Sequence, residues 1–170
     1  MFIHSFGLFW RADEIDWNPG KGARGAFRLL GRIGSNLPKI RLADFRNQQG
    51  IYVLYCEYGP YYVGLTKRQG LGKRLKDHLS DHLAEKWDRF SWFGFCSILP
   101  DKDNTGLCVL EEMAEIAEVI PESLISDVEA LLIKSIGPRN INQAHFTQAE
   151  EWRQVRLDET EYYMSKVARV

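Results

Sequence analysis

Long hydrophobic runs and cysteine-rich motifs are both missing from this sequence of 170 residues. No apolar stretch approaches the roughly 20 residues that a membrane-spanning helix needs, so we expect no membrane partner. The three cysteines are an odd number without metal-site spacing, which is typical of reduced thiols in a cytoplasmic protein. An acidic run follows the apolar residues 1–10, which argues against a secretory signal and favours a β-strand there.

A strong excess of one charge is also missing, because the net charge is −1. The charges are nevertheless unevenly distributed. Residues 1–90 carry fifteen Lys or Arg against nine Asp or Glu, whereas residues 91–130 carry only Lys102 against nine acids. A basic first half and an acidic segment can lie on opposite sides of one domain. The charges therefore permit a polyanionic partner without requiring one. If such a partner binds, the acidic segment 101–129 is expected to face away from that partner or to contact a different one.

The hydrophobic pattern predicts strands and helices in one small α+β domain. Residues 51–55 and 61–65 are β-branched and aromatic, and they enclose turn-like residues, which predicts a β-hairpin. The remaining expected elements are a strand at 92–99 and helices at 23–30, 71–83, 107–119, 123–136 and 147–167.

The expected fold is a small antiparallel three-stranded sheet flanked by helices. Residues 1–47 would be an N-terminal extension, and residues 48–145 would be the core, with an insertion near 101–120. Residues 146–170 would add a C-terminal helix. The extension is rich in Gly and Arg over residues 20–46, so it is expected to wrap the core or to reach a substrate, and the alternative is a solvated loop region.

Two tyrosines in the predicted hairpin each lie beside glycine, in Gly50-Ile51-Tyr52 and Tyr62-Val63-Gly64. A tyrosine in a strand most often serves packing. Glycine in a strand, however, often marks the close approach of a ligand or of another part of the chain.

A basic segment precedes the helix predicted at 71–83. It contains Lys67, Arg68 and Lys73, and it is suited to binding an anionic substrate near a helix N-terminus. Arg74 and His78 follow at positions i and i+4, so they share one face of that helix. The alternative is a solvated basic turn with a half-buried histidine.

A carboxylate, Glu129, lies in a helix with apolar residues one turn away on either side. A buried, ionised carboxylate needs a partner, which could be a divalent metal ion or an arginine. The alternative is an exposed position at the edge of an amphipathic helix. Pro138 ends this helix, and Asn140 and Asn142 follow it in what looks like turn chemistry.

Taken together, these residues resemble the GIY-YIG nuclease family over residues 48–145. The ordered set is more specific than either tripeptide. It comprises Gly50-Ile51-Tyr52, Tyr62-Val63-Gly64, a helix with Arg74 and His78, Glu129, and Pro138 followed by asparagine. The chain departs from the family in reading Tyr-Val-Gly in the second tripeptide. It also has Ile141 at the usual asparagine position, so either Asn140 or Asn142 would take that role.

The resemblance implies a metal-dependent endonuclease that hydrolyses DNA and leaves a 5′-phosphate and a 3′-hydroxyl. Tyr52 would activate or position the attacking water with support from Tyr62, and a role as a base requires a phenol pKa below its usual value near 10. Arg74 would hold the phosphate, and His78 would either support the residues that bind it or transfer a proton. Asn140 or Asn142 would orient the backbone or the region around Glu129. Glu129 would bind one Mg²⁺ or Mn²⁺ ion. A role in restriction, phage defence or mobile-element biology and a homodimer are compatible with this function.

Two alternatives remain at this point. His78 and His82 have the i, i+4 spacing of zinc ligands on a helix, which would indicate a zinc hydrolase. The stretch lacks, however, the Glu that follows the first His in common zinc proteases. The second alternative is a non-catalytic module that binds nucleic acid or a protein partner on the same fold.

Overall fold

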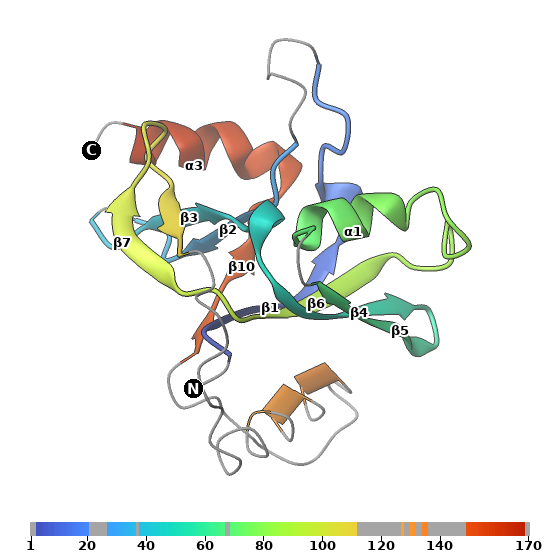
Figure 1. The fold of residues 1–170 in the computed structure, drawn as a ribbon. Coiled ribbons are helices and arrows are strands. Elements are labelled where there is room, and N and C mark those ends of the chain that lie inside the picture. Colours follow the sequence, from blue (N-terminus) through green and yellow to red (C-terminus); the bar gives the residue numbers. More distant parts are fainter. Residues whose placement is uncertain are drawn as a thin grey trace.

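The computed structural model describes residues 3–20, 27–36, 38–66, 69–111, 127, 130–131, 134–135 and 149–168. Its strands are β1 (Ser5–Arg11), β2 (Leu30–Ile33), β3 (Arg41–Asp44), β4 (Gly50–Cys56), β5 (Gly59–Thr66), β6 (Arg89–Gly94), β7 (Ile98–Lys102), β8 (Cys108–Leu110), β9 (Glu150–Glu151) and β10 (Arg153–Gln154). The α-helices with described bounds are α1 (Leu71–Asp77) and α3 (Thr160–Val167), and the 3-10 helices are η1 (Ala12–Glu14), η3 (Phe45–Asn47) and η5 (Leu157–Glu159) (Figure 1).

The strands form two five-stranded sheets. Sheet A has the order β5-β4-β6-β1-β9, and sheet B has the order β10-β2-β3-β8-β7. The chain passes from sheet A to sheet B at Trp152, the single residue between β9 and β10. This tryptophan is fully buried, and its amide donates to the Phe6 carbonyl of β1 over 2.7 Å. Trp152 therefore anchors one of the crossings between the two sheets, the one from β9 to β10.

The predicted fold class, a small antiparallel three-stranded sheet flanked by helices, is wrong. The three predicted strands are present as the antiparallel neighbours β5, β4 and β6, but they belong to the larger sheet A. Strand β1 pairs with the other side of β6, and β9 pairs with β1. Residues 1–47 also contribute β2 and β3 to sheet B. The strand expected within residues 1–10 is present as β1, but its pairing with β6 was not predicted, and the local pattern did not reveal β2, β3 or β9.

Several predicted elements also change type or extent. The single strand expected at 92–99 is two strands, since β6 lies in sheet A and β7 in sheet B. Strand β8 occupies the start of the helix expected at 107–119, because Cys108 pairs with Ala43 of β3. Strands β9 and β10 replace the first part of the helix expected at 147–167, and Leu30 begins β2 where a helix was expected to end. In each case pairing with a neighbouring strand overrides the local preference.

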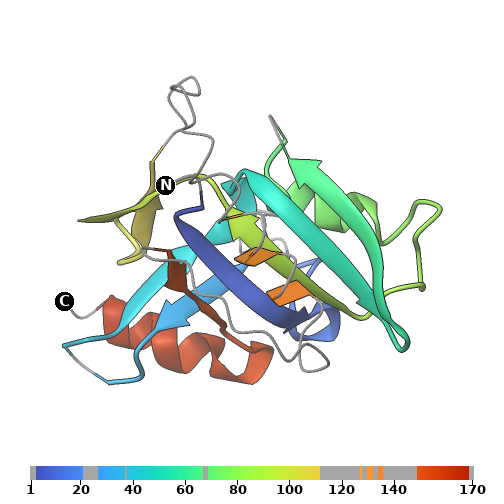
Figure 2. The ribbon, with the colours of Figure 1, turned by 90° about the horizontal axis from the view of Figure 1, so that it is seen from below.

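Sheet A is covered on both faces (Figure 1, Figure 2). One face packs against α1 and sheet B around a cluster of large aromatic residues that includes Trp10, Phe45, Trp92 and Trp152. The opposite face packs around Phe6, Val53, Tyr55 and Phe93 against the helical residues Ala130 and Leu131. Helix α3 covers the outer face of sheet B through Tyr163 and Val167. None of the helices in the described part of the chain is long and apolar enough to cross a membrane.

Candidate active site

The two motif tyrosines lie on the same face of the β4–β5 hairpin. Tyr52 is directly opposite Gly64, and Leu54 is opposite Tyr62. Because side chains alternate between the faces of a strand, both tyrosine rings face α1. Their ring centroids are 6.2 Å apart. Tyr52 is fully buried, and Tyr62 is half-buried. Tyr52 is therefore the inner residue of the pair.

Helix α1 places Arg74 and His78 over these rings. The helix starts after Gly70, whose φ of +71° lies in a region that side chains rarely adopt. Leu71 and Leu75 are buried and hold the helix against the sheet. The helix ends at Asp77 with His78 as its C-cap, well before the predicted end at residue 83. Arg74 is half-buried, so it lies nearer to solvent than Tyr52 does.

A hydrogen-bonded chain joins three side chains at this site. The Tyr52 Oη atom lies 2.7 Å from His78 Nε2, and His78 Nδ1 lies 2.7 Å from Asp81 Oδ2. His78 is buried, whereas the Asp81 side chain is 32% exposed. The Tyr62 ring packs edge-on against the His78 ring with centroids 5.3 Å apart. The chain thus leads from a buried phenol through a buried imidazole to a partly hydrated carboxylate.

The pKa of the Tyr52 phenol moves in the direction opposite to the sequence-based expectation. Burial raises this pKa to about 12, and the nearby Arg74 guanidinium lowers it only in part. The expected fall below 10 is therefore wrong, because the loss of hydration outweighs the single positive charge. At neutral pH the phenol is protonated, and it can give up its proton only to a nearby acceptor.

Asp81 was not identified from the sequence. Burial alone would raise the pKa of its carboxyl, but hydrogen bonds from the Leu83 amide and the His78 ring hold this pKa below the usual value. The sequence did contain one signal, since Asp81 lies three residues after His78, a spacing at which side chains meet on a helix or turn.

Of the other predicted site residues, only Lys73 lies within the part of the chain that the structure describes. Lys73 is exposed and pairs with Asp77 one turn along α1, with Nζ 3.0 Å from the Asp77 carboxylate. Lys67, Arg68, Glu129, Asn140 and Asn142 lie outside the described residues. The neighbours of Glu129, Ala130 and Leu131, pack on the face of sheet A opposite to the Tyr52 ring. The residues brought together are therefore Tyr52, Tyr62, Arg74 and His78, with Asp81.

The zinc alternative does not agree with this geometry. The His82 side chain is 77% exposed, and both ring nitrogens of His78 already have partners. The Nδ1 atoms of His78 and His82 lie 2.7 Å and 4.0 Å from the same Asp81 Oδ2 atom, so the point between the two rings is occupied by a carboxylate oxygen that already bonds to His78. Among the described residues, no three His, Cys, Asp or Glu side chains are grouped to hold a metal ion.

The arginines of the segment predicted to contact DNA make contacts within the protein. Arg41 pairs with Glu150 at 2.6 Å, and Arg46 pairs with Asp44 at 2.7 Å. The Arg32 guanidinium lies 4.8 Å from the centroid of the Tyr163 ring. The contacts of Arg41 and Arg32 therefore help to join β3 and β2 to Glu150 of β9 and to helix α3, whereas the Arg46 ion pair is local.

Neither a family model, nor a curated protein, nor a solved structure matches this chain. The GIY-YIG resemblance therefore rests on the motif residues of the sequence alone.

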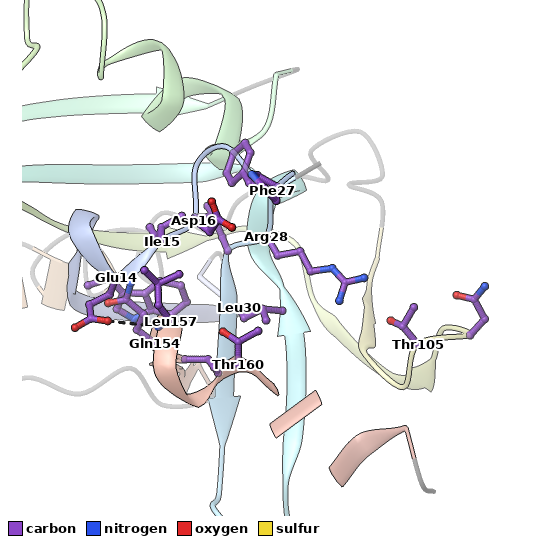
Figure 3. Close-up of a pocket in the computed structure, with 15 residues that line it drawn as sticks. Glu14, Ile15, Asp16, Phe27, Arg28, Leu30, Thr105, Gln154, Leu157 and Thr160 are labelled. Atoms are coloured by element: carbon purple, nitrogen blue, oxygen red, sulfur yellow. Dashed lines mark hydrogen bonds between the residues drawn. The ribbon is translucent and has the colours of Figure 1, made fainter. Parts of the chain in front are cut away.

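A pocket of about 670 Å³ lies away from the tyrosine site, next to sheet B (Figure 3). Glu14, Gln154 and Leu157 gather at one end, and Arg28 extends toward Thr105 at the other. Among the described residues, none of those predicted to be catalytic (Tyr52, Tyr62, Arg74 and His78) lines this pocket. The pocket is therefore separate from the candidate active site.

Proposed function

We propose that the protein is a metal-dependent endonuclease that hydrolyses DNA phosphodiester bonds and leaves a 5′-phosphate and a 3′-hydroxyl. The observation that carries the proposal is the convergence of Tyr52, Tyr62, Arg74 and His78 from two strands and a helix on one site. These are the residue types that phosphodiester hydrolysis needs for water activation, proton transfer and charge stabilisation. Restriction, phage defence or mobile-element biology is the proposed setting, and a homodimer would allow both strands to be cut.

In this proposal, Tyr52 relays a proton from the attacking water to His78. A phenolate is rare at neutral pH because the pKa of Tyr52 is about 12. The phenol can instead accept the water proton while its own proton moves to His78 Nε2, 2.7 Å away. The water oxygen then attacks phosphorus, and the bond to the 3′-oxygen breaks. The resulting 3′-oxygen takes up a proton from solvent.

Arg74 is the proposed phosphate ligand. Its guanidinium is half-buried beside the Tyr52 phenol, in a position to bind the phosphoryl oxygens with two parallel hydrogen bonds. A phosphate that binds Arg74 would draw the guanidinium outward, away from Tyr52. The attacking water would then reach the phenol, which is fully buried without substrate.

The proposed ligand of one Mg²⁺ or Mn²⁺ ion is Glu129, and this part rests on the sequence alone. The ion would neutralise charge on the phosphoryl oxygens. The described residues next to Glu129 pack on the opposite face of sheet A from Tyr52, so the proposed proton transfer from Tyr52 to His78 does not involve the ion.

A non-catalytic DNA-binding or partner-binding module is the second candidate function. The observation that favours it is the complete burial of Tyr52, because a packing tyrosine has the same environment. The buried Tyr52–His78 hydrogen bond would then serve stability alone.

A cleavage assay separates the two candidates. Wild type, Arg74→Ala and Glu129→Ala are incubated with plasmid, linear duplex and single-stranded DNA in Mg²⁺, Mn²⁺ or EDTA. Lys86→Ala is the control, because it removes one exposed positive charge outside the site. We expect metal-dependent cleavage by wild type and Lys86→Ala, and its loss in the other two variants. DNA binding by wild type without cleavage under any condition would support the binding module instead.

A further inference from the structure

Asp81 ends the hydrogen-bonded chain that begins at the buried phenol of Tyr52. Its Oδ2 atom lies 2.7 Å from His78 Nδ1, and its Oδ1 atom accepts from the Leu83 amide over 2.8 Å. The second bond holds the carboxylate so that one oxygen faces the imidazole. None of the residues that the family resemblance implies corresponds to Asp81, so it is an additional residue of the site.

The chemistry of the carboxylate decides the direction of both histidine hydrogen bonds. An ionised carboxylate only accepts hydrogen bonds, so His78 Nδ1 must carry the proton that bonds to Asp81. In a neutral imidazole the other nitrogen is then an acceptor. His78 Nε2 therefore accepts the O–H of Tyr52, and the phenolic lone pairs are directed away from the ring.

We infer that Asp81 is a positioning residue, which holds the imidazole of His78 in the Nδ1–H tautomer so that Nε2 accepts the Tyr52 proton. A second part of the inference rests on the proposed nuclease function. When the proton reaches Nε2 during hydrolysis, the negative charge of Asp81 stabilises the imidazolium that forms. The Trp87 indole supports this arrangement by donating to the His78 carbonyl over 3.3 Å, which helps to hold the backbone of the residue.

The Asp81→Asn variant provides a directional test. The Leu83 amide needs an acceptor, so the amide oxygen of the new side chain takes the place of Oδ1. Its NH₂ group then faces His78 Nδ1 and can only donate. The imidazole must respond by carrying its proton on Nε2, which reverses the hydrogen bond with Tyr52.

Nitrogen-15 NMR of the histidine rings at neutral pH reads the tautomer without any enzymatic assay. The His78 signals are assigned by their absence from His78→Phe. We expect the Nδ1–H tautomer in wild type and the Nε2–H tautomer in Asp81→Asn. Asp81→Glu, which keeps a carboxylate, should retain the wild-type tautomer. The matched control is Asp77→Asn, which makes the same chemical change one turn earlier, where the carboxylate pairs with Lys73. Nε2–H in wild type, or Nδ1–H retained in Asp81→Asn, would overturn the inference.

Cleavage rates test the second part. We expect kcat to fall by roughly tenfold or more in Asp81→Asn relative to Asp77→Asn, with KM unchanged, because the change affects proton transfer and not phosphate binding. Equal kcat values in the two variants would overturn the catalytic role even if the tautomer changes. If wild type does not cleave DNA while the tautomer switches as expected, the nuclease proposal fails and the positioning role of Asp81 stands.

Discussion

The ring of Tyr52 occupies the space that a side chain at position 64 would need. A Cβ atom added to Gly64 would overlap both the phenolic oxygen and the carbon that bears it. Tyr52 and Gly64 are directly opposite each other on β4 and β5, so this close approach follows from the register of the hairpin. The glycine of the Tyr62-Val63-Gly64 segment thus has a physical reason, which is to leave room for the Tyr52 ring.

We predict that Gly64→Ala displaces the Tyr52 phenol and lowers the free energy of unfolding by about 1–3 kcal/mol, because the added methyl overpacks a buried site. Urea unfolding measures this change. Gly20→Ala is the control, since nothing lies within 4 Å of a Cβ at that position. Equal stability of the two variants would show that the sheet can relax around the added methyl group.

His78 and His82 should differ sharply in their importance. His78→Phe keeps a ring but leaves the Tyr52 hydroxyl and the Asp81 carboxylate without their shared partner. We expect a loss of about 2 kcal/mol in the free energy of unfolding and, under the proposed function, loss of cleavage. His82→Gln changes an exposed ring and should alter stability by less than about 0.5 kcal/mol. Thermal unfolding and the DNA cleavage assay test both variants, and loss of cleavage in His82→Gln would contradict the assignment of roles.

The raised pKa of Tyr52 predicts a loss of stability at alkaline pH. The folded-state pKa is about 12, whereas an unfolded tyrosine ionises near pH 10. Between these values the phenol is ionised only in the unfolded chain, so the free energy of unfolding falls as pH rises from 10 to 12. The contribution of this residue is on the order of 2 kcal/mol.

Urea unfolding between pH 9 and pH 12 would test this dependence, with Tyr52→Phe lacking the Tyr52 contribution. Tyr58→Phe is the control, because the Tyr58 side chain is 84% exposed. If Tyr52→Phe loses as much stability over this range as Tyr58→Phe does, the Tyr52 phenol has an ordinary pKa.

Gln48 should be the most sensitive polar residue outside the site. Its buried amide donates to Ser5 Oγ and to the Cys96 carbonyl, and its Oε1 atom accepts from the Cys96 and Gln49 amides. Gln48→Met keeps the side-chain length but leaves these groups unpaired. We expect a loss of at least about 2 kcal/mol in the free energy of unfolding, measured in urea. Gln69→Met, at an exposed position, should change little.

The sequence alone determined the local parts of the site. The β4–β5 hairpin was predicted because its strands are β-branched and aromatic and because its turn is short, so both signals lie within a few residues of each other. The start of α1 after Gly70 was also predicted, because the spacing of apolar residues along one helical face is likewise a local signal. These two elements place Tyr52, Tyr62, Arg74 and His78, and the structure brings all four together.

The tertiary structure decided the rest, because the deciding interactions join segments far apart in the chain. Strand β1 pairs with β6, and β9 adds to β1, so the sheet has five strands where local patterns predicted three. The early end of α1 reflects competition from the Asp81 side chain, which bonds to the Leu83 amide and to His78. The pKa of Tyr52 follows from burial between α1 and sheet A. Burial is a property of the assembled fold, and no pattern of neighbouring residues in the sequence reports it.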